Sequence, residues 1–265
     1  MMLHRVANRR RWRTPFTSRG VVAAGGLLLA ALVVQVPARA QSAGNGFLFK
    51  VPRGSVTLRG GFDHAFASSD LFSLTTNDLT VNRGDFSAFT IGGDVAFRLT
   101  PRIDAVFGSS YSGKSTPSES RDFVEGPDNL PIQQTVTFKR VPLTASARFY
   151  LASRGRAVGR FAWVPASFVP YVGIGGGAMW YRFRREGDFV DPQTFVINTD
   201  ELTSDGWTPE VHATVGTEFA IGPRFAITGE AQYTWAKAKP STDFEGFDKI
   251  DLSGIAATAG LSVRF

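Results

Sequence analysis

The chain ends in "GIAATAGLSVRF", residues 254–265, in which apolar residues alternate with small or polar ones up to the last position. Ile255 and Leu261 fall on one face of an extended chain, and Thr258 falls on the other. A period of two residues is typical of a β-strand, because successive side chains of a strand point to opposite faces. This segment therefore predicts a strand with one apolar face.

The same alternation recurs in seven segments upstream, and together these segments predict an all-β chain with eight strands. A ten-stranded variant is the alternative, because "FVDPQTFVIN", residues 189–198, could form an additional hairpin. The seven segments are "SVTLRGGF" (55–62), "FTIGGDVAFRL" (89–99), "IDAVFGSSY" (103–111), residues 136–151, "PYVGIGGGAMWYRF" (170–183), "EVHATVGTEFAI" (210–221) and "RFAITGEAQYTW" (224–235).

The connections between these segments differ in length in a regular way. Tight turns at "TPR" and "GPR" alternate with polar connections, of which the longest are expected at 67–85, 112–132 and 184–206. Outer-membrane barrels combine long outer loops with short periplasmic turns, and a tilted strand of roughly 9 to 11 residues crosses the bilayer. We therefore expect a closed antiparallel up-and-down transmembrane β-barrel, since only closure pairs every backbone group in lipid. A soluble barrel with its apolar face inward is the alternative.

The N-terminal 40 residues have the pattern of a secretory signal peptide. A basic segment precedes the apolar run "VVAAGGLLLAALVVQV", and "ARA" follows it, which predicts cleavage after Ala38 and Ala40, before Gln41. An uncleaved anchor and a twin-arginine signal at "NRRRW" are the alternatives. We expect three parts: signal peptide 1–40, periplasmic segment 41–53 and barrel domain 54–265.

The charge balance argues against a nucleic-acid partner. Of the 29 Lys and Arg residues, seven lie in residues 1–40, where acidic residues are absent, and the remaining 22 nearly balance the 23 acidic residues. A nucleic-acid site needs its basic residues on the folded domain. The chain has no Cys, so disulfides and thiolate metal sites are excluded.

The last strand also resembles the C-terminal signal of the bacterial outer-membrane β-barrel family. In "TAGLSVRF" the pattern polar-x-Gly-x-x-hydrophobic-x-aromatic is met by Thr258, Gly260, Val263 and Phe265. Strand count and loop order are similar to the small eight-stranded barrels related to the OmpA membrane domain, OmpX and OmpW. The resemblance implies an outer-membrane location, contact with lipid and lipopolysaccharide, and recognition by the barrel assembly machinery.

Charged side chains on the polar face of the strands would point into the barrel lumen. Since unpaired buried charge is costly, we expect them to form a paired ionic network in a lumen too narrow for a general porin. This network comprises Arg59, Asp63, Asp94, Arg98, Asp104, Arg148, Glu210, His212, Glu218, Glu230 and Arg264. His212 could instead serve a lipid A-modifying enzyme, but the sequence lacks a neighbouring His-x-Ser pattern, so we expect neither catalysis nor a resident metal or cofactor.

Two further features concern ligands. "GSSYSGKS", residues 108–115, matches a P-loop pattern, but no helix is predicted after it, so we expect no nucleotide and place Lys114 in an outer loop. The outer loops 67–85, 112–132, 184–206 and 237–251 hold 17 acidic and 8 basic residues, which could share divalent cations with lipopolysaccharide. The expected function is structural or surface interaction, or narrow passage of small or apolar solutes; an adhesin is a further alternative.

Overall fold

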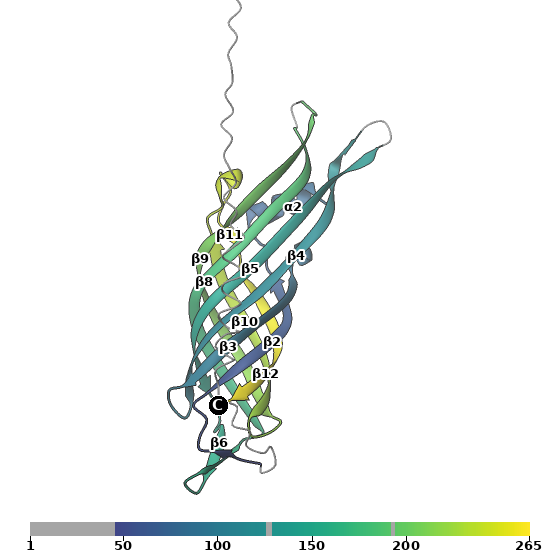
Figure 1. The fold of residues 1–265 in the computed structure, drawn as a ribbon. Coiled ribbons are helices and arrows are strands. Elements are labelled where there is room, and N and C mark those ends of the chain that lie inside the picture. The colour runs from purple at the N-terminus through teal and green to yellow at the C-terminus, as the bar shows by residue number, and fades with distance from the viewer. Residues whose placement is uncertain (1–45, 126–128, 192–193) are drawn as a thin grey trace, which may run out of the picture. The chain divides into compact units, whose positions relative to one another are not determined.

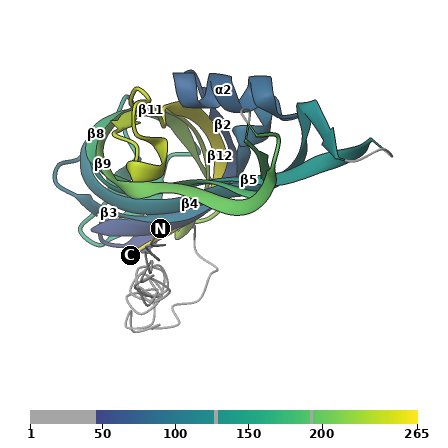
Figure 2. The ribbon, with the colours of Figure 1, turned by 90° about the horizontal axis from the view of Figure 1, so that it is seen from above.

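One antiparallel ring of strands dominates the computed structural model, which describes residues 46–125, 129–191 and 194–265. In these residues eight long strands each pair with two neighbours, and the last strand pairs with the first (Figure 1 and Figure 2). The all-β antiparallel prediction is therefore confirmed. The strands are β2 (Gly54–Ala65), β3 (Ala88–Arg98), β4 (Ile103–Glu125), β5 (Leu130–Tyr150), β8 (Phe168–Val190), β9 (Ile197–Ala220), β10 (Phe225–Ala238) and β12 (Gly254–Arg264).

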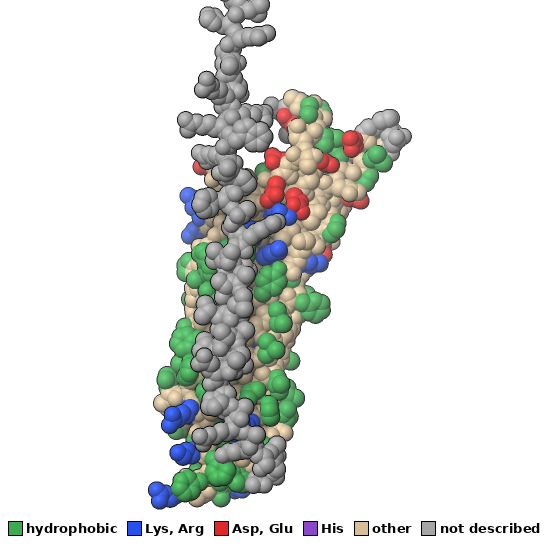
Figure 3. All heavy atoms as spheres, in the orientation of Figure 1, with side chains coloured by type: hydrophobic (Ala, Val, Ile, Leu, Met, Phe, Trp, Pro, Cys, Tyr) green, Lys and Arg blue, Asp and Glu red, His purple; other side chains and the backbone are tan. Residues whose placement is uncertain are grey.

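Large apolar side chains cover the outside of the ring. On β3, Phe89 and Ile91 are 83% and 61% exposed, whereas Thr90 and Asp94 are buried inside. Figure 3 shows hydrophobic side chains over the strands and acidic side chains gathered near one end. The alternative of a soluble barrel with an apolar interior is therefore wrong.

Two hairpins continue as paired strands beyond this apolar belt. The outward face of β4 turns polar after Tyr111 and that of β9 after Trp207, read toward the hairpin tips, yet both strands stay paired with their neighbours. The expectation that 112–132 and 184–206 are loops is wrong, because backbone pairing within a hairpin does not require an apolar face. Val190 pairs with Ile197, so residues 189–198 end the β8–β9 hairpin and add no strands to the ring.

A loop-end cover closes the ring at the end where the long connections lie (Figure 1). It consists of α2 (Asp70–Asp78), η2 (Arg83–Phe86), η3 (Thr242–Phe244) and β11 (Ile250–Asp251). Helix α2 directs Phe72 inward, where its ring centroid lies 4.7 Å from that of Phe86, 5.3 Å from Phe138 and 5.5 Å from Phe183. The cover therefore packs an apolar core onto the inner face of β5 and β8.

A turn-end cover lies at the opposite end. Strands β1 (Leu48–Phe49), β7 (Ala162–Pro165) and β6 (Gly155–Val158) form a three-stranded sheet that joins the N-terminal segment to the β5–β8 connection. Trp163 of this sheet is only 3% exposed. Among the described residues, no helix has both the length and the apolar character needed to span a membrane. The predicted signal peptide and its cleavage site lie outside the described residues.

Candidate functional site

The centre of the ring interior holds a four-membered charge group from four strands. Glu230 lies 2.8 Å from Arg59 and 3.3 Å from Arg148, and Asp94 lies 3.6 Å and 3.9 Å from the same two guanidinium groups. Tyr171 donates a hydrogen bond of 3.1 Å to Glu230. Two positive and two negative side chains therefore balance one another across the lumen.

Gly216 makes room for this arrangement. A β-carbon at Gly216 would lie 2.5 Å from the ring of Tyr171 and 2.7 Å from the carbonyl of Gly229. Only a glycine allows such a close approach without moving the ring. The sequence of β9 thus contributes to the central charge group through a residue without a side chain.

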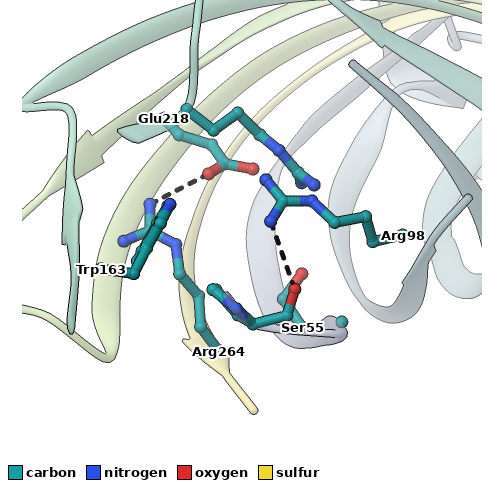
Figure 4. Close-up of a pocket in the computed structure, with 8 residues that line it drawn as sticks. Ser55, Arg98, Trp163, Glu218 and Arg264 are labelled. Carbon is teal, nitrogen blue, oxygen red and sulfur yellow. Dashed lines mark hydrogen bonds and ion pairs between the residues drawn. The ribbon is translucent and has the colours of Figure 1, made fainter. Parts of the chain in front are cut away.

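A second charge group occupies the turn end. Arg154 contacts Asp104 at 2.6 Å, and Arg264 contacts Glu218 at 3.1 Å. Tyr150 lies between the two pairs and donates hydrogen bonds of 2.6 Å to Glu218 and 3.3 Å to Asp104. Figure 4 shows Arg98, Glu218 and Arg264 converging on a cavity beside Trp163.

A third contact ties the loop-end cover to the ring. Arg140 lies 2.8 Å from Asp63 and donates a hydrogen bond of 2.7 Å to the carbonyl oxygen of Leu252. Ser112 donates a further hydrogen bond of 2.8 Å to Asp63. Arg140 therefore links the Asp63 ion pair to the loop-end cover, because Leu252 belongs to the apolar core of that cover.

Glu210 and His212 form a separate pair on β9. His212 Nδ1 lies 3.0 Å from Glu210 Oε1, and both side chains are buried inside the ring. Among the described residues, no cluster of three or more His, Asp or Glu side chains could hold a metal ion. The structure thus pairs these two residues with each other and keeps them apart from the three charge groups.

The space left inside the ring is small. Arg59, Glu230 and Arg140 border a cavity of about 40 Å³, and the turn-end cavity measures about 10 Å³. A cavity of roughly 10 to 15 Å³ holds one water. These two cavities are therefore water-sized spaces rather than parts of a wide pore, as expected for eight strands.

The cover at the loop end carries two acidic side chains with perturbed titration. Burial would raise the pKa of Asp251, but hydrogen bonds from Ser68 and Ser253 outweigh it and lower that pKa. The backbone N–H of Asn82 and the ammonium of Lys114, 3.1 Å away, lower the pKa of Asp85. Lys114 therefore pairs within the protein, and the P-loop-like segment lies in β4 with no helix after it.

Several partners in these groups were not predicted from sequence. Arg140 lies on the same face as Arg148, so extending the alternation of β5 toward its start would have found it. Arg154 lies in the connection after β5, where no alternation applies, so no sequence pattern indicated that it points into the ring. Tyr181 is buried under the loop-end cover and does not lie at the membrane interface.

The residues of the C-terminal pattern all lie at the seam between β12 and β2. Thr258 pairs with Gly61, Gly260 with Arg59 and Val263 with Val56. The backbone N–H of Phe265 donates to the carbonyl of Gly54. The pattern therefore coincides with the seam where the ring joins its own ends.

Comparison with known proteins identifies the family. The profile described as "Outer membrane protein beta-barrel domain" matches residues 26–265. The chain belongs to this outer-membrane β-barrel family. Its location is therefore the outer membrane, as predicted, and the belt that includes Phe89 and Ile91 faces lipid. Among curated protein sequences none matches the chain.

Solved structures similar to this barrel are small outer-membrane proteins. OprG from Pseudomonas aeruginosa is 13% identical, with a TM-score of 0.44, and 82% of this chain covers 99% of that one. Neisserial surface protein A is 14% identical, with a TM-score of 0.42 and coverages of 83% and 98%. A major outer membrane protein from Thermus thermophilus is 10% identical, with a TM-score of 0.43 and coverages of 82% and 100%.

Proposed function

We propose that the protein is a closed, non-conducting and non-catalytic outer-membrane barrel that presents its two long hairpins for surface interaction. The observation that carries this proposal is the contrast between a lumen filled at three levels and hairpins that extend past the lipid-facing belt. A conduit needs a continuous path, whereas a display scaffold needs a rigid base. The ionic groups and the apolar cover supply such a base.

The hairpin tips carry exposed apolar side chains, one of which, Phe195, also lies 6.4 Å from the ring of Phe123 on the other hairpin. Val124, Leu130 and Phe195 are 56%, 56% and 69% exposed at the ends of the two hairpins. Phe195 also adopts a φ of 56°, which a bulky residue occupies at an energetic cost. Exposed apolar groups held in a strained backbone support a role in binding a partner.

Lipopolysaccharide is the partner proposed at the membrane boundary. Lys139 and Arg182 pair with each other on adjacent strands, two residues beyond the pair of Val141 and Trp180 toward the hairpin tips. Basic groups at this level face the phosphates of an outer-leaflet lipid. Divalent cations shared between those phosphates and acidic hairpin residues such as Glu186 belong to the same proposal.

Planar-bilayer recording tests the closed lumen. The purified, refolded barrel is expected to give no discrete conductance steps, and its folded state is checked by a gel band that shifts only after heating. Regular conductance steps from the folded protein would contradict the proposal. Uptake of an apolar solute into vesicles would contradict it too.

A second experiment tests the display role. Cells that present the Val124→Ser/Phe195→Ser variant are compared with cells that present the native barrel in adhesion to epithelial monolayers. The variant is expected to reach the surface in equal amount, because both side chains are exposed, and to adhere less. Thr199→Ser is the control, because Thr199 is an exposed residue of the same hairpin. Equal adhesion of all three would remove the tips from the function.

A further inference from the structure

The turn-end charge group contains more positive than negative side chains. Arg98, Arg154 and Arg264 are gathered there, but only two carboxylates, Asp104 and Glu218, lie among them. Arg98 reaches the main-chain oxygen of Pro52 at 3.4 Å and forms no ion pair among the described residues. Among the described side chains of this group, three guanidinium groups therefore face two carboxylates, whereas the central group has two of each.

Each of these three guanidinium groups has one nitrogen donor without a hydrogen-bond partner among the described residues. Arg98 Nε, Arg154 Nε and Arg264 Nη1 are buried and have no hydrogen-bond partner within the described part of the chain. Arg264 is itself only 7% exposed. Buried polar groups are paired in nearly all proteins, so three free donors in one place indicate a missing acceptor.

Asp104 and Glu218 do not supply that acceptor inside the cavity. Glu218 lines it, but one of its oxygens accepts from Tyr150 and the other from Arg264. Asp104 has one free oxygen, Oδ1, yet it is not among the residues that line the cavity. Neither carboxylate therefore has a free oxygen at the cavity.

The cavity lined by these three arginines is about as large as one water molecule. Its volume is about 10 Å³, and Arg98, Arg154 and Arg264 all line it together with Ser55 (Figure 4). One water-sized particle fits such a space. A chloride ion is larger than a water but smaller than phosphate, sulfate or carboxylate ligands, so it is the common anion that needs the least displacement of the residues lining this space.

We propose that this cavity is a binding site for one small monovalent anion of the chloride class. The anion accepts hydrogen bonds from Arg264 Nη1 and Arg98 Nε and balances the third guanidinium charge. Charge-assisted bonds of this kind are stronger than those a neutral water would make. A water in the same place would satisfy donors but leave the excess charge.

The site also joins three separate parts of the protein. Pro52 comes from the N-terminal segment, Trp163 from the β6–β7 hairpin, and Arg264 from the last strand of the ring. The guanidinium carbons of Arg98 and Arg264 lie 6.0 Å and 5.9 Å from the Trp163 ring centroid. The bound anion therefore fastens the turn-end cover to the ring.

Crystals of the native protein soaked in sodium bromide test occupancy directly. An anomalous difference peak is expected in the cavity, within hydrogen-bond reach of Arg264 Nη1 and Arg98 Nε. A map with no bromide in the cavity, showing water only, overturns the proposal. This measurement needs no variant and so does not depend on whether a mutant folds.

Hydrogen exchange in solution tests the fastening role with Arg98→Gln. Replacing chloride by gluconate at constant ionic strength is expected to speed exchange in residues 48–53 and 155–165 of the native protein. The exposed control, Arg102→Gln, is expected to respond in the same way, while Arg98→Gln exchanges equally fast in both salts. The proposal is refuted if the exchange rates of the native protein are the same in chloride and in gluconate. It is also refuted if the Arg98→Gln protein still exchanges faster in gluconate.

Discussion

Glu230→Gln is the substitution that should weaken the ring interior most specifically. The carboxylate of Glu230 contacts both Arg59 and Arg148 and accepts the hydroxyl of Tyr171. Glutamine has nearly the same shape but no charge, so two guanidinium groups would then share Asp94 alone, at 3.6 Å and 3.9 Å. The substitution therefore removes the negative charge and leaves the packing of the side chain nearly unchanged.

The expected loss follows from the burial of these partners. Removing one member of a buried ion pair costs about 3 to 5 kcal/mol, because the remaining charge is left uncompensated. Arg59 and Glu230 border the 40 Å³ cavity, which has room for water that solvates part of the exposed charge. We therefore expect the lower end of that range, about 3 kcal/mol.

Urea unfolding in lipid vesicles, followed by tryptophan fluorescence, measures this loss. Glu201→Gln is the matched control, because Glu201 pairs with Arg184 at 3.4 Å but its side chain is 54% exposed. An exposed pair contributes roughly 0.2 to 1 kcal/mol. If Glu230→Gln destabilises the barrel no more than Glu201→Gln does, the central group is not a buried ionic network and the reasoning fails.

Three further predictions concern the covers and the close contacts. Phe72→Ala should destabilise the loop-end cover by about 3 to 5 kcal/mol and speed proteolysis within residues 66–87, whereas Leu74→Ala on the exposed side of α2 should leave proteolysis unchanged. Gly216→Ala should cost about 1 to 3 kcal/mol in urea unfolding by displacing Tyr171, whereas Gly229→Ala, whose nearest contact would be 4.0 Å away, should be tolerated; equal effects would contradict the close approach. Asp251 stabilises the cover fully above the ordinary aspartate pKa of about 4, and this contribution is lost as pH falls through its lowered pKa; hydrogen exchange of residues 66–87 should therefore rise in acid, and Asp251→Asn should flatten that rise.

The ring could be predicted from sequence because its signal is periodic. Alternation in segments such as 89–99 reflects one lipid face and one lumen face, and it predicted eight strands, while the ten-stranded and the soluble alternatives were excluded only by the structure. The hairpin extensions could not be predicted in this way, because both faces of β4 beyond Ser112 meet water or polar neighbours. Without two different environments, a strand has no alternation to detect.

The charge groups were predictable as a set of inward residues but not as pairs. Arg59 and Asp94 lie on the neighbouring strands β2 and β3, but Glu230 lies on β10, far away in sequence, and the stagger of the ring decides which of these residues meet. Arg154 and Trp163 enter the lumen from a connection, where no period applies. The loop-end core likewise depends on how Phe72 and Phe244 fold back over the strands, which their local sequence does not specify.

The seam between β12 and β2 means that the ring can close only after the last strand of the chain is available. Thr57 and Ser262, hydrogen-bonded across the seam, are 205 residues apart in the chain. Until the last strand arrives, β2 has one edge with unpaired N–H and C=O groups, and such an edge recruits other strands. Loop closure over this distance is slow as well. A chain truncated before residue 254 would therefore remain an open sheet whose unpaired strand edges can pair with other chains. Such a chain would depend on a chaperone in the periplasm to stay unaggregated.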